Sequence, residues 1–357
     1  MKKNSEISVI VCFKNAEKTI KSTLESILNQ TFKDFELILI DDNSEDSSLE
    51  FCKELQKKNN NIRIVSFSNS LKPLKARQEG VRNSNSKYIF FCDADDILPS
   101  NSLEVLHDIA TETDVDVVCG GFQYVIGRKL NFVYDFKNVL NFDGKLINDL
   151  IVNFKENEKT KYSFFGGHSI PISFWGKLFR RDKLIDFEKA DLPYLHNFDD
   201  TYGNLIIFNS IKSIYFTPKL VYKYYHGGFT SKVNHDILKD FDKVYLLRKN
   251  NIMNEQSKNL SNLEYFNVFI SYIENCMIVE NTKKQDIHHI VNKHLKDGYL
   301  NEVVEYFLNV NTNNDLIKSL SCNDIDAFEK EIRKSVESKK LKRKLTRLSL
   351  SFINKFL

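Results

Sequence analysis

The sequence predicts an α/β fold: a mostly parallel sheet with helices on both faces, followed by a helical extension at the C-terminus. Three observations predict it. Short apolar runs rich in β-branched residues alternate with helical apolar stripes over the first 120 residues. The runs are apolar throughout, as is typical of parallel strands buried on both faces. Helical spacing dominates beyond about residue 236, and 357 residues of ordinary globular composition suffice for two or three domains.

Each element of the first half follows from a local pattern. The run "ISVIVCF" predicts a strand at 7–13. In residues 16–30 the apolar positions recur at i, i+4, i+7 and i+8, which predicts a helix. Because strand and helix alternate from here on, the strands are expected to pair in parallel. The further strands are predicted at 35–40, 62–67, 88–92 and 115–121, and the further helices at 47–58, 74–84 and 102–110.

The rest of the chain is less regular. Residues 122–165 have weak periodicity, and we interpret them as strands or a hairpin with a loop. After them α/β character returns before the helical region begins. We therefore expect one domain over 1–232, with halves at about 1–120 and 121–232, and a helical region over 233–357.

Composition excludes several classes of protein. A net charge of +3 gives no reason to expect a nucleic-acid partner. The six cysteines form no C-x-x-C pair and no zinc-type spacing, which favours a reducing, cytoplasmic compartment. The apolar run near the N-terminus is too short for a signal peptide, and no stretch approaches the ~20 apolar residues of a membrane span. Neither G-x-G-x-x-G nor G-x-x-x-x-G-K-[ST] occurs, which excludes dinucleotide-binding and P-loop sites.

Acidic turns follow two of the predicted strands. "DDNS" (41–44) follows the second strand, and Asp93, Asp95 and Asp96 follow the fourth. The carboxyl ends of parallel strands meet at one edge of a sheet, so both turns should face the same crevice. So much negative charge near a core requires a protein cation, a metal ion or water beside it. If a nucleotide diphosphate binds there, Mg²⁺ or Mn²⁺ would offset its repulsion from the acids. Helix capping is the alternative, and it explains Asp96 but not all three acids.

Four stretches, at residues 7–48, 75–104, 174–182 and 197–207, carry the motifs of one family in the order in which that family has them. Together they resemble the family 2 glycosyltransferases, which have the Rossmann-like GT-A fold. Within that family they resemble the type that makes bacterial surface polysaccharides and glycoconjugates. Residues 7–48 resemble the nucleotide-binding start, and 75–104 resemble the segment that ends in the D-x-D motif. "FWGKLFRRD" (174–182) resembles the W-x-K-L-[FY]-R element, and "NFDDTYGNLII" (197–207) takes the place of the acidic E-D motif. The sequence departs from the family at three points: "CFKN" replaces P-x-Y-N, "ARQ" replaces A-R-N, and two aspartates replace E-D.

The resemblance implies an inverting, metal-dependent hexosyl- or N-acetylhexosaminyl-transferase. Such an enzyme moves a sugar from a nucleotide-sugar donor, with UDP the common carrier, to a hydroxyl of a glycan, lipid-linked glycan or glycoprotein. A divalent cation, Mn²⁺ or Mg²⁺, is implied with it. Residues 1–120 become the donor-binding half and 121–232 the acceptor and catalytic half. The residues that the resemblance places at the donor are Cys12, Lys14, Asn15, Asp42, Arg77, Asp93 and Ala94.

The remaining roles fall to single residues. Asp200 is expected to be the base that accepts the proton of the acceptor hydroxyl, with Asp199 as second choice and an ordinary acidic helix start as the alternative. Asp95 is expected to bind the metal. His226 is expected to contact the metal or the diphosphate. The alternative is a histidine that is packed in the core or lies on the surface without a ligand. Acceptor binding is expected of Asp96, His168 and Trp175. For the tryptophan, core packing is the alternative.

The end of the chain has a basic amphipathic pattern. In "LKRKLTRLSLSFINKFL" (341–357), leucine and phenylalanine recur at helical spacing among lysines and arginines. Such a helix suits the anionic inner face of a cell membrane, which predicts a cytoplasmic protein that lies peripherally on that face. Packing on its own protein, or in a homodimer, is the alternative.

Two other functions stay open at this point. A nucleotidylyltransferase also uses an α/β nucleotide fold, although "CFKNAEKT" lacks the glycine-rich phosphate loop of that class. A non-catalytic glycan-binding or assembly subunit on a degenerate transferase fold is the second. The retained acids at 93, 95 and 200 argue against it.

Overall fold

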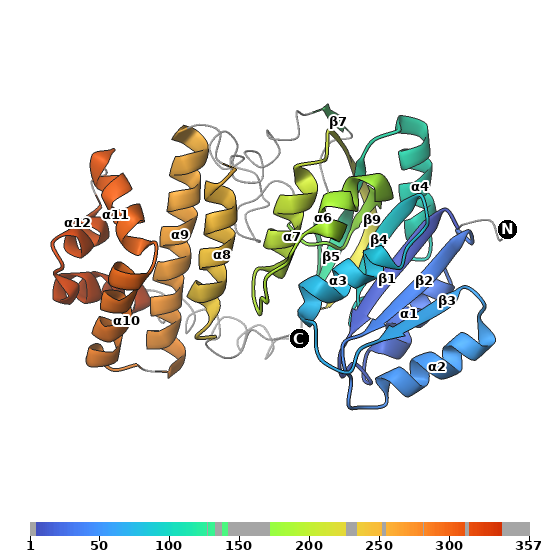
Figure 1. Cartoon of the computed structure of the whole chain (residues 1–357), viewed down its shortest axis with the longest axis horizontal. Coiled ribbons are helices and arrows are strands. Elements are labelled where there is room, and N and C mark those ends of the chain that lie inside the picture. The colour runs from blue at the N-terminus through green and yellow to red at the C-terminus, as the bar shows by residue number, and fades with distance from the viewer. Residues whose placement is uncertain are drawn as a thin grey trace, which may run out of the picture. The chain divides into compact units, whose positions relative to one another are not determined.

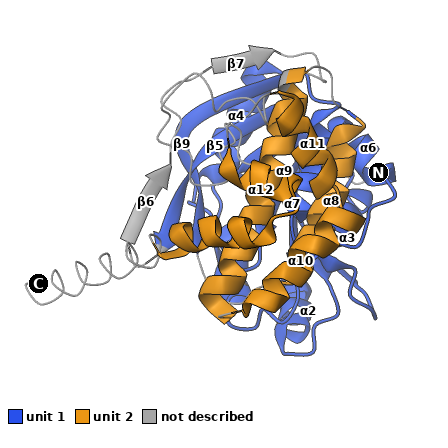
Figure 2. Cartoon of the chain, turned by 90° about the vertical axis from the view of Figure 1, so that its left-hand side faces the viewer, with its two compact units in different colours: residues 1–228, 251–253 blue, residues 229–250, 254–357 orange. Residues whose placement is uncertain are grey.

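The structure is a computed structural model of the chain. The residues that it describes are 5–126, 128–132, 138–141, 172–225, 234–251, 255–280, 282–310 and 314–337. The chain divides into two compact units, of which the first comprises residues 1–228 and 251–253 and the second 229–250 and 254–357 (Figure 2).

The first unit alternates strands and helices, as its apolar runs and stripes predict (Figure 1). Its elements in chain order are β1 (Ile7–Phe13), α1 (Ile20–Leu28), β2 (Phe35–Asp41), α2 (Ser48–Lys58), β3 (Ile62–Ser66), α3 (Lys72–Arg82), β4 (Tyr88–Asp93), α4 (Ser102–Thr113), β5 (Val117–Ile126), β6 (Arg128–Phe132), β7 (Asn138–Asn141), β8 (Lys177–Arg180), the 3-10 turn η1 (Arg181–Leu184), α6 (Ile185–Lys189), α7 (Asp199–Phe208) and β9 (Ser213–Tyr225).

One mixed sheet forms the centre of this unit. Its strand order is β3-β2-β1-β4-β8-β5-β9-β7, and β6 pairs with β5. The pairs β1–β2, β1–β4, β2–β3 and β5–β9 are parallel, while β8 runs antiparallel between β4 and β5. The predicted α/β class with a mostly parallel sheet is therefore confirmed. The antiparallel strand β8 was not distinguished by the sequence pattern.

Helices cover both faces of the sheet because successive side chains of each strand point to opposite sides. On one side, Val9 of β1 belongs to a core cluster with Leu24 of α1 and Leu103 of α4. On the other side, Ile10 joins a cluster with Leu74 of α3. Both faces are apolar, so the parallel strands read as continuous apolar runs in the sequence.

The helix predicted at 16–30 begins only at Ile20. The backbone amide of Ala16 instead donates to the Ser48 hydroxyl at 2.8 Å, and that of Asn15 donates to Ser44. These bonds join the loop after β1 to the loop after β2 and to the first residue of α2. They bring two of the loops expected at the donor side by side.

Within 122–165, the antiparallel hairpin of β5 and β6 confirms the predicted strands as far as residue 132. Residues 142–171 lie outside the described residues. His168 is among them, so its predicted acceptor role stays a prediction.

The second unit is helical wherever the structure describes it, which confirms the predicted helical C-terminal region. Its elements are α8 (Ile237–Lys249), α9 (Glu255–Asn275), the π-helical turn η2 (Cys276–Glu280), α10 (Lys284–Asp297), α11 (Leu300–Asn309), α12 (Asp315–Ser321) and a further helix at 325–337.

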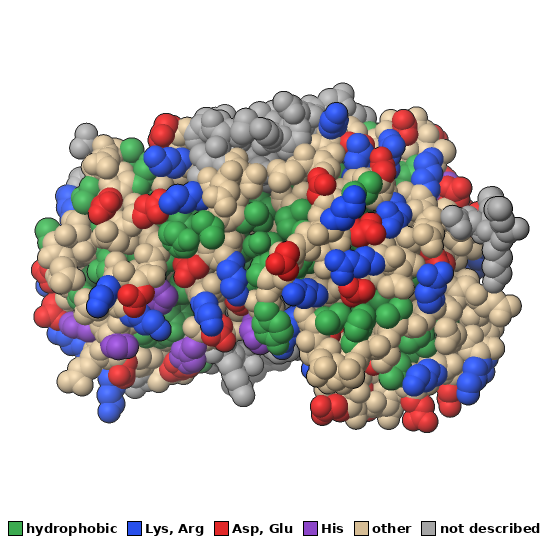
Figure 3. All heavy atoms as spheres, in the orientation of Figure 1, with side chains coloured by type: hydrophobic (Ala, Val, Ile, Leu, Met, Phe, Trp, Pro, Cys, Tyr) green, Lys and Arg blue, Asp and Glu red, His purple; other side chains and the backbone are tan. Residues whose placement is uncertain are grey.

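Nothing in the described helices is both long and apolar enough to cross a membrane. On the face shown in Figure 3, acidic and basic side chains are interspersed, in keeping with a net charge of +3. The basic segment 341–357 lies outside the described residues, so its membrane or dimer role stays a prediction.

Candidate functional site

The carboxyl ends of three neighbouring strands carry the candidate site. The parallel register sets Phe13 of β1 beside Asp41 of β2, and Cys12 beside Asp93 of β4. Asp42 and the turn at 93–96 thus follow strands that end at the same edge of the sheet, as the parallel pairing predicts. The acidic turns therefore lie where open α/β sheets bind their ligands.

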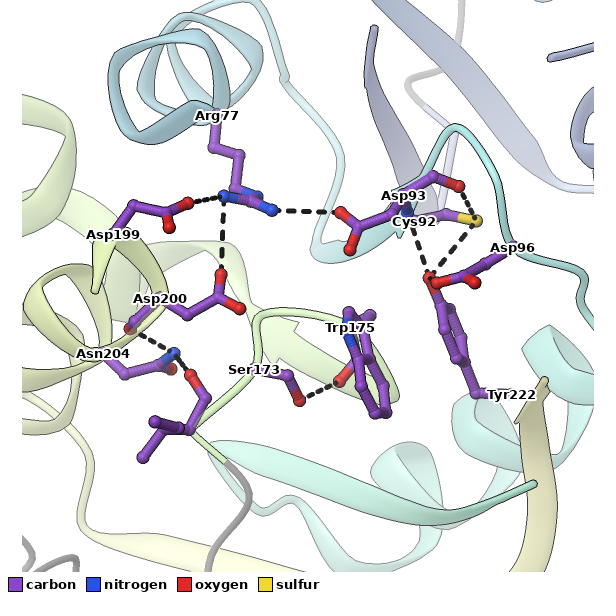
Figure 4. A network of polar contacts seen from close by, with 11 residues as sticks. Arg77, Cys92, Asp93, Asp96, Ser173, Trp175, Asp199, Asp200, Asn204 and Tyr222 are labelled. Atoms are coloured by element: carbon purple, nitrogen blue, oxygen red, sulfur yellow. Dashed lines mark hydrogen bonds and ion pairs between the residues drawn. The ribbon is translucent and has the colours of Figure 1, made fainter. Parts of the chain in front are cut away.

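Arg77 connects this edge to helix α7 (Figure 4). Its side chain lies on the buried side of α3, and its guanidinium contacts three carboxylates. The distances are 3.0 Å to Asp93 Oδ1, 2.5 Å to Asp199 Oδ2 and 3.4 Å to Asp200 Oδ1. Burial alone would lower the pKa of Arg77, but the three carboxylates raise it well above its ordinary value. Arg77 therefore stays charged and is a protein cation beside these acids.

One guanidinium does not balance all the acids at this edge. Arg77 faces three carboxylates, and Asp95 has no ion-pair partner among the residues that the structure describes. Desolvation, followed by repulsion from Asp93, raises the pKa of Asp95. The site thus keeps surplus negative charge, which a divalent cation or a proton would offset.

Asp200, one of the three acids that contact Arg77, is placed to take up and release a proton near neutral pH. Burial, together with the charges of Asp199 and Asp93, raises its pKa to about 7 although Arg77 and Lys177 act in the opposite direction. Its Oδ1 is buried and accepts no hydrogen bond from the described residues. A carboxylate with such a pKa can accept a proton at neutral pH, which suits a general base.

The start of α7 aims these acids at Arg77. Phe198 precedes the helix with φ of 59°, a left-handed conformation that is unusual for an aromatic residue. Asn204, one turn into the helix, donates to the backbone oxygens of Asp200 at 2.9 Å and Ile172 at 2.5 Å. The helix start is therefore fixed to the segment before β8, and sterically strained backbone of this kind is common at functional sites.

The D-A-D turn offers oxygen ligands of the kind that hard divalent cations prefer. Asp95 is exposed, and Asp93 contacts Arg77 through Oδ1, which leaves its Oδ2 for another partner. Carboxylate oxygens suit Mg²⁺ and Mn²⁺. The residues present at this turn therefore fit the divalent cation that the family resemblance implies.

Asp42 organises the loop before α3. Its carboxylate accepts hydrogen bonds from the Ser70 hydroxyl at 2.7 Å, from the Lys72 amide at 3.2 Å and from the Leu71 amide. Lys72, the first residue of α3, has φ of 70°, a left-handed conformation that is uncommon for a residue with a side chain. Asp42 is buried, and its predicted role at the donor stays a prediction.

The other residues predicted at the donor lie around the end of β1. Cys12 is partly buried, and burial raises its pKa to about 12, so its thiol is not a nucleophile at neutral pH. Lys14 and Asn15 are exposed, and Asn15 Oδ1 accepts from the Glu45 amide at 2.8 Å. Ala94 is partly buried between the two acids of the D-A-D turn.

Asp96 points away from this group of acids. It is fully buried, and its carboxyl group bonds the Tyr222 hydroxyl at 2.7 Å and the Tyr225 amide at 2.8 Å. Burial, followed by repulsion from Asp93, raises its pKa to about 9. The interpretation of Asp96 as an acceptor-binding residue has no support in this arrangement, because its side chain exposes no surface.

Trp175 is packed against aromatic rings. It is 5% exposed and stacks on Tyr222, with ring centroids 4.7 Å apart, and on Tyr224 at 5.3 Å. This favours the core-packing alternative, and acceptor binding by Trp175 stays a prediction. His226 lies outside the described residues, so its predicted role at the metal or diphosphate is also untested.

Two residues near the site were missed by the sequence analysis. The Tyr222 hydroxyl accepts from the Asp93 amide at 3.0 Å. Lys177 is 1% exposed, burial lowers its pKa to about 8, and its ammonium donates to the backbone oxygen of Ser173. In "LVYKYY" (220–225) the alternation places Tyr222 and Tyr224 on one face of a strand. This pattern could have indicated that Tyr222 is buried.

Comparison with known proteins gives three findings. The model of a family described as "Glycosyl transferase family 2" matches residues 8–186. The chain is 33% identical over 181 residues to the cholesterol galactosyltransferase of Borreliella burgdorferi, and the match covers 50% of this chain and 49% of that protein. The chain thus spans about half the length of this curated relative, and 20–38% of the next three.

The third finding concerns solved structures. TarS 1–349 of S. aureus in complex with UDP-GlcNAc has a TM-score of 0.69 at 19% identity, covering 94% of this chain and 92% of that one. The mannosyltransferase PcManGT of Pyrobaculum calidifontis, in complex with GDP-Man and Mn²⁺, has a TM-score of 0.50 at 13% identity, covering 94% and 84%. At these identities the likeness concerns the fold, and it confirms the predicted GT-A-type architecture.

Proposed function

The chain belongs to the family 2 glycosyltransferases, and from this premise we propose that it is an inverting, metal-dependent glycosyltransferase. Its donor would be a nucleotide sugar, with UDP as the carrier, and its acceptor a hydroxyl of a glycan, a lipid-linked glycan or a glycoprotein. The product would belong to a bacterial surface polysaccharide or glycoconjugate. The binding of UDP-GlcNAc by TarS, a protein of the same fold, supports the choice of donor class.

One observation carries the proposal. At the carboxyl edge of the sheet, Arg77 holds Asp93, Asp199 and Asp200 together, while Asp95 stands exposed without an ion-pair partner among the described residues. The arrangement combines one cation, an acid for a metal and a partly buried acid for a proton. Each would contribute to the transfer of a sugar from a diphosphate.

The donor's diphosphate would lie over the D-A-D turn. Asp95, with the Oδ2 of Asp93, would hold the divalent cation, which when bound stabilises the negative charge of the leaving diphosphate as a Lewis acid. The Mn²⁺ in the complex of PcManGT supports the choice of a divalent cation. Cys12, Lys14, Asn15, Asp42 and Ala94 would line the rest of the donor site.

Asp200 would act as the base. As the acceptor oxygen attacks the anomeric carbon, the acceptor O–H bond breaks and the proton passes to the Asp200 carboxylate. The bond from the anomeric carbon to the diphosphate oxygen breaks with its electron pair on the diphosphate. Attack from the side opposite the leaving group inverts the anomeric centre without a covalent intermediate. Asp199 would be less suited to this role, because Arg77 holds its Oδ2 at 2.5 Å.

An assay of donor cleavage tests this function. The protein is incubated with a panel of nucleotide sugars, Mn²⁺ and glycan or lipid-linked acceptors, with and without EDTA, and release of the nucleoside diphosphate is measured. We expect release that EDTA abolishes. Release of pyrophosphate from a nucleoside triphosphate would instead favour a nucleotidylyltransferase. Thermal stabilisation by a nucleotide sugar without turnover for any acceptor would favour a glycan-binding subunit.

The location of the protein in the cell, at the inner face of the membrane, is also a proposal. A lipid-linked acceptor is presented at the membrane surface, where the basic segment 341–357 would bring the enzyme. Sedimentation with vesicles of anionic lipid, compared for the full chain and a chain ending at residue 337, measures this directly. Equal sedimentation of the two chains would show that the segment is not the anchor.

A further inference from the structure

The turn that carries Asp93 and Asp95 is fixed to strand β9 by a group of buried hydrogen bonds. The Tyr222 hydroxyl accepts from the Asp93 amide at 3.0 Å and bonds the Asp96 carboxyl at 2.7 Å. Asp96 also accepts from the Tyr225 amide at 2.8 Å. Tyr222 thus touches both ends of the turn, from a strand far away in the sequence (Figure 4).

Backbone pairing extends this connection. The Ile97 amide donates to the Lys223 oxygen at 3.1 Å, and the Lys223 amide donates back at 2.9 Å. Residues 96 and 97 therefore lie along β9, while Asp95 remains exposed in front of them. The exposed acid is held between two points whose positions the sheet determines.

The Tyr222 ring itself cannot move freely. It is fully buried, it stacks on Trp175 with an angle of 7° between the ring planes, and Phe90 of β4 lies against it with centroids 6.4 Å apart. Because packed interiors leave few voids, a ring enclosed in this way keeps its hydroxyl at a fixed position. The hydroxyl is therefore a rigid anchor for the turn.

We propose that Tyr222 and Asp96 are positioning residues that hold the D-A-D turn, residues 93–95, in the orientation in which Asp95 and Asp93 present their carboxylates to the donor's divalent cation. The proposal rests on the proposed function for the identity of that ligand. Neither residue touches the donor or the metal. They act through the backbone amide of Asp93 and through the start of the segment that follows the turn.

Tyr222→Phe tests the anchor with little change of shape, because the ring and its stacking on Trp175 remain. Tyr88→Phe is a matched control. Tyr88 is buried on the same strand as Asp93, and its hydroxyl has no hydrogen-bond partner among the described residues. Asp96→Asn is the conservative variant, because an amide keeps the shape of the side chain and can bond both the Tyr222 hydroxyl and the Tyr225 amide.

The first measurement is amide hydrogen exchange over residues 93–97 of the ligand-free protein. We expect faster exchange at Asp93 in Tyr222→Phe than in the wild-type chain, and wild-type exchange in Tyr88→Phe. The second is calorimetric titration with UDP in the presence of Mn²⁺. We expect the dissociation constant to rise about 3- to 10-fold in Tyr222→Phe, the size of one lost hydrogen bond, and to stay within about 2-fold in Tyr88→Phe and Asp96→Asn.

Three results would overturn the inference. Unchanged exchange at Asp93 in Tyr222→Phe would show that the hydroxyl does not hold the turn. Equal affinities of the wild type and Tyr222→Phe would show that the anchor does not serve the ligand. A loss in Asp96→Asn as large as that in Asp95→Asn would make Asp96 a ligand. If the wild-type chain binds no UDP with Mn²⁺, the proposed donor site fails and this role for the anchor fails with it, while the exchange result still decides whether the anchor exists.

Discussion

The carboxylate of Asp200 lies 3.4 Å from the guanidinium of Arg77, yet its Oδ1 accepts no hydrogen bond from the residues that the structure describes. Asp200 thus lies beside a cation and still has a carboxylate oxygen that can accept a hydrogen bond or a proton. Asp199, the neighbouring acid, is bound to the same guanidinium at 2.5 Å. The two acids are adjacent in sequence but differ in what they can accept.

Asp200→Asn should separate donor binding from transfer. An amide cannot take the proton of the acceptor hydroxyl, so we expect kcat to fall about 100- to 10,000-fold while UDP affinity in Mn²⁺ changes little. Steady-state kinetics and calorimetry on the same preparation measure the two effects. Full activity in Asp200→Asn would show that another group is the base.

The pH dependence should report the same acid. Because burial raises the pKa of Asp200 to about 7, this group is protonated and inactive as a base below that pH and ionised above it. We therefore expect kcat/KM to rise with pH through an apparent pKa near 7. The charge of Asp199 contributes to the raised value, so Asp199→Asn should move the rise to lower pH. A rise centred near 4 in the wild-type chain would contradict this assignment.

Asp95→Asn should remove the metal-dependent part of donor binding. A change in a residue behind a metal ligand typically lowers metal affinity 10- to 100-fold. Loss of a carboxylate that binds the metal directly should weaken UDP binding in Mn²⁺ by at least as much. Calorimetry with UDP in Mn²⁺ and then in EDTA separates the effects, since in EDTA the variant and the wild type should bind equally. Asp108→Asn, which changes an exposed acid of α4, is the control. If Asp95→Asn weakened UDP binding as much in EDTA as in Mn²⁺, Asp95 would contact UDP itself and not the metal.

Arg77 should matter for stability as well as for binding. Arg77→Met leaves three partly exposed carboxylates without their buried cation, so the free energy of unfolding should fall by about 3 kcal/mol, the lower end of the range for a buried ion pair. The stability of Arg77→Lys should lie between that of the wild type and that of Arg77→Met, because a single ammonium cannot bridge three acids. Urea unfolding measures the change. Arg82→Met on the same helix, where an exposed arginine pairs with Glu79, should cost about 1 kcal/mol or less. A similar small cost for Arg77→Met would contradict the central place of this residue.

Much of the fold could be predicted because each parallel strand is a compact local signal. The run at 7–13 became β1 with the same bounds, and the run at 88–92 became β4, one residue longer. Strand β8 was not predicted as a separate antiparallel strand. It is only four residues long, and its place between β4 and β5 depends on pairing with residues far away in the chain.

The candidate site could be predicted in location but not in its connections. Parallel pairing alone sends the acidic turns to one edge, whereas the bonds from Arg77 span 16 residues to Asp93 and 122 to Asp199. A local signal did exist. Leu74, Arg77 and Val81 recur at helical spacing, which places the arginine on the buried side of α3.

The different environment of Asp96 could not be predicted from its place beside Asp93 and Asp95 in the sequence. In the sequence it resembles Asp93 and Asp95, since all three follow the same apolar run. The pairing of Ile97 with Lys223 of β9 turns it into the core, where it bonds Tyr222. That pairing joins segments about 126 residues apart (Ile97 and Lys223), so no local pattern announces it.

Anomalous diffraction at the manganese edge, from crystals grown with Mn²⁺ and UDP, tests the proposed metal site most directly. We expect a manganese peak beside the carboxylates of Asp95 and Asp93, with the diphosphate of UDP on its other side. A crystal containing neither ion nor nucleotide at this edge of the sheet, with Asp93, Asp199 and Asp200 still paired only with Arg77, would contradict it.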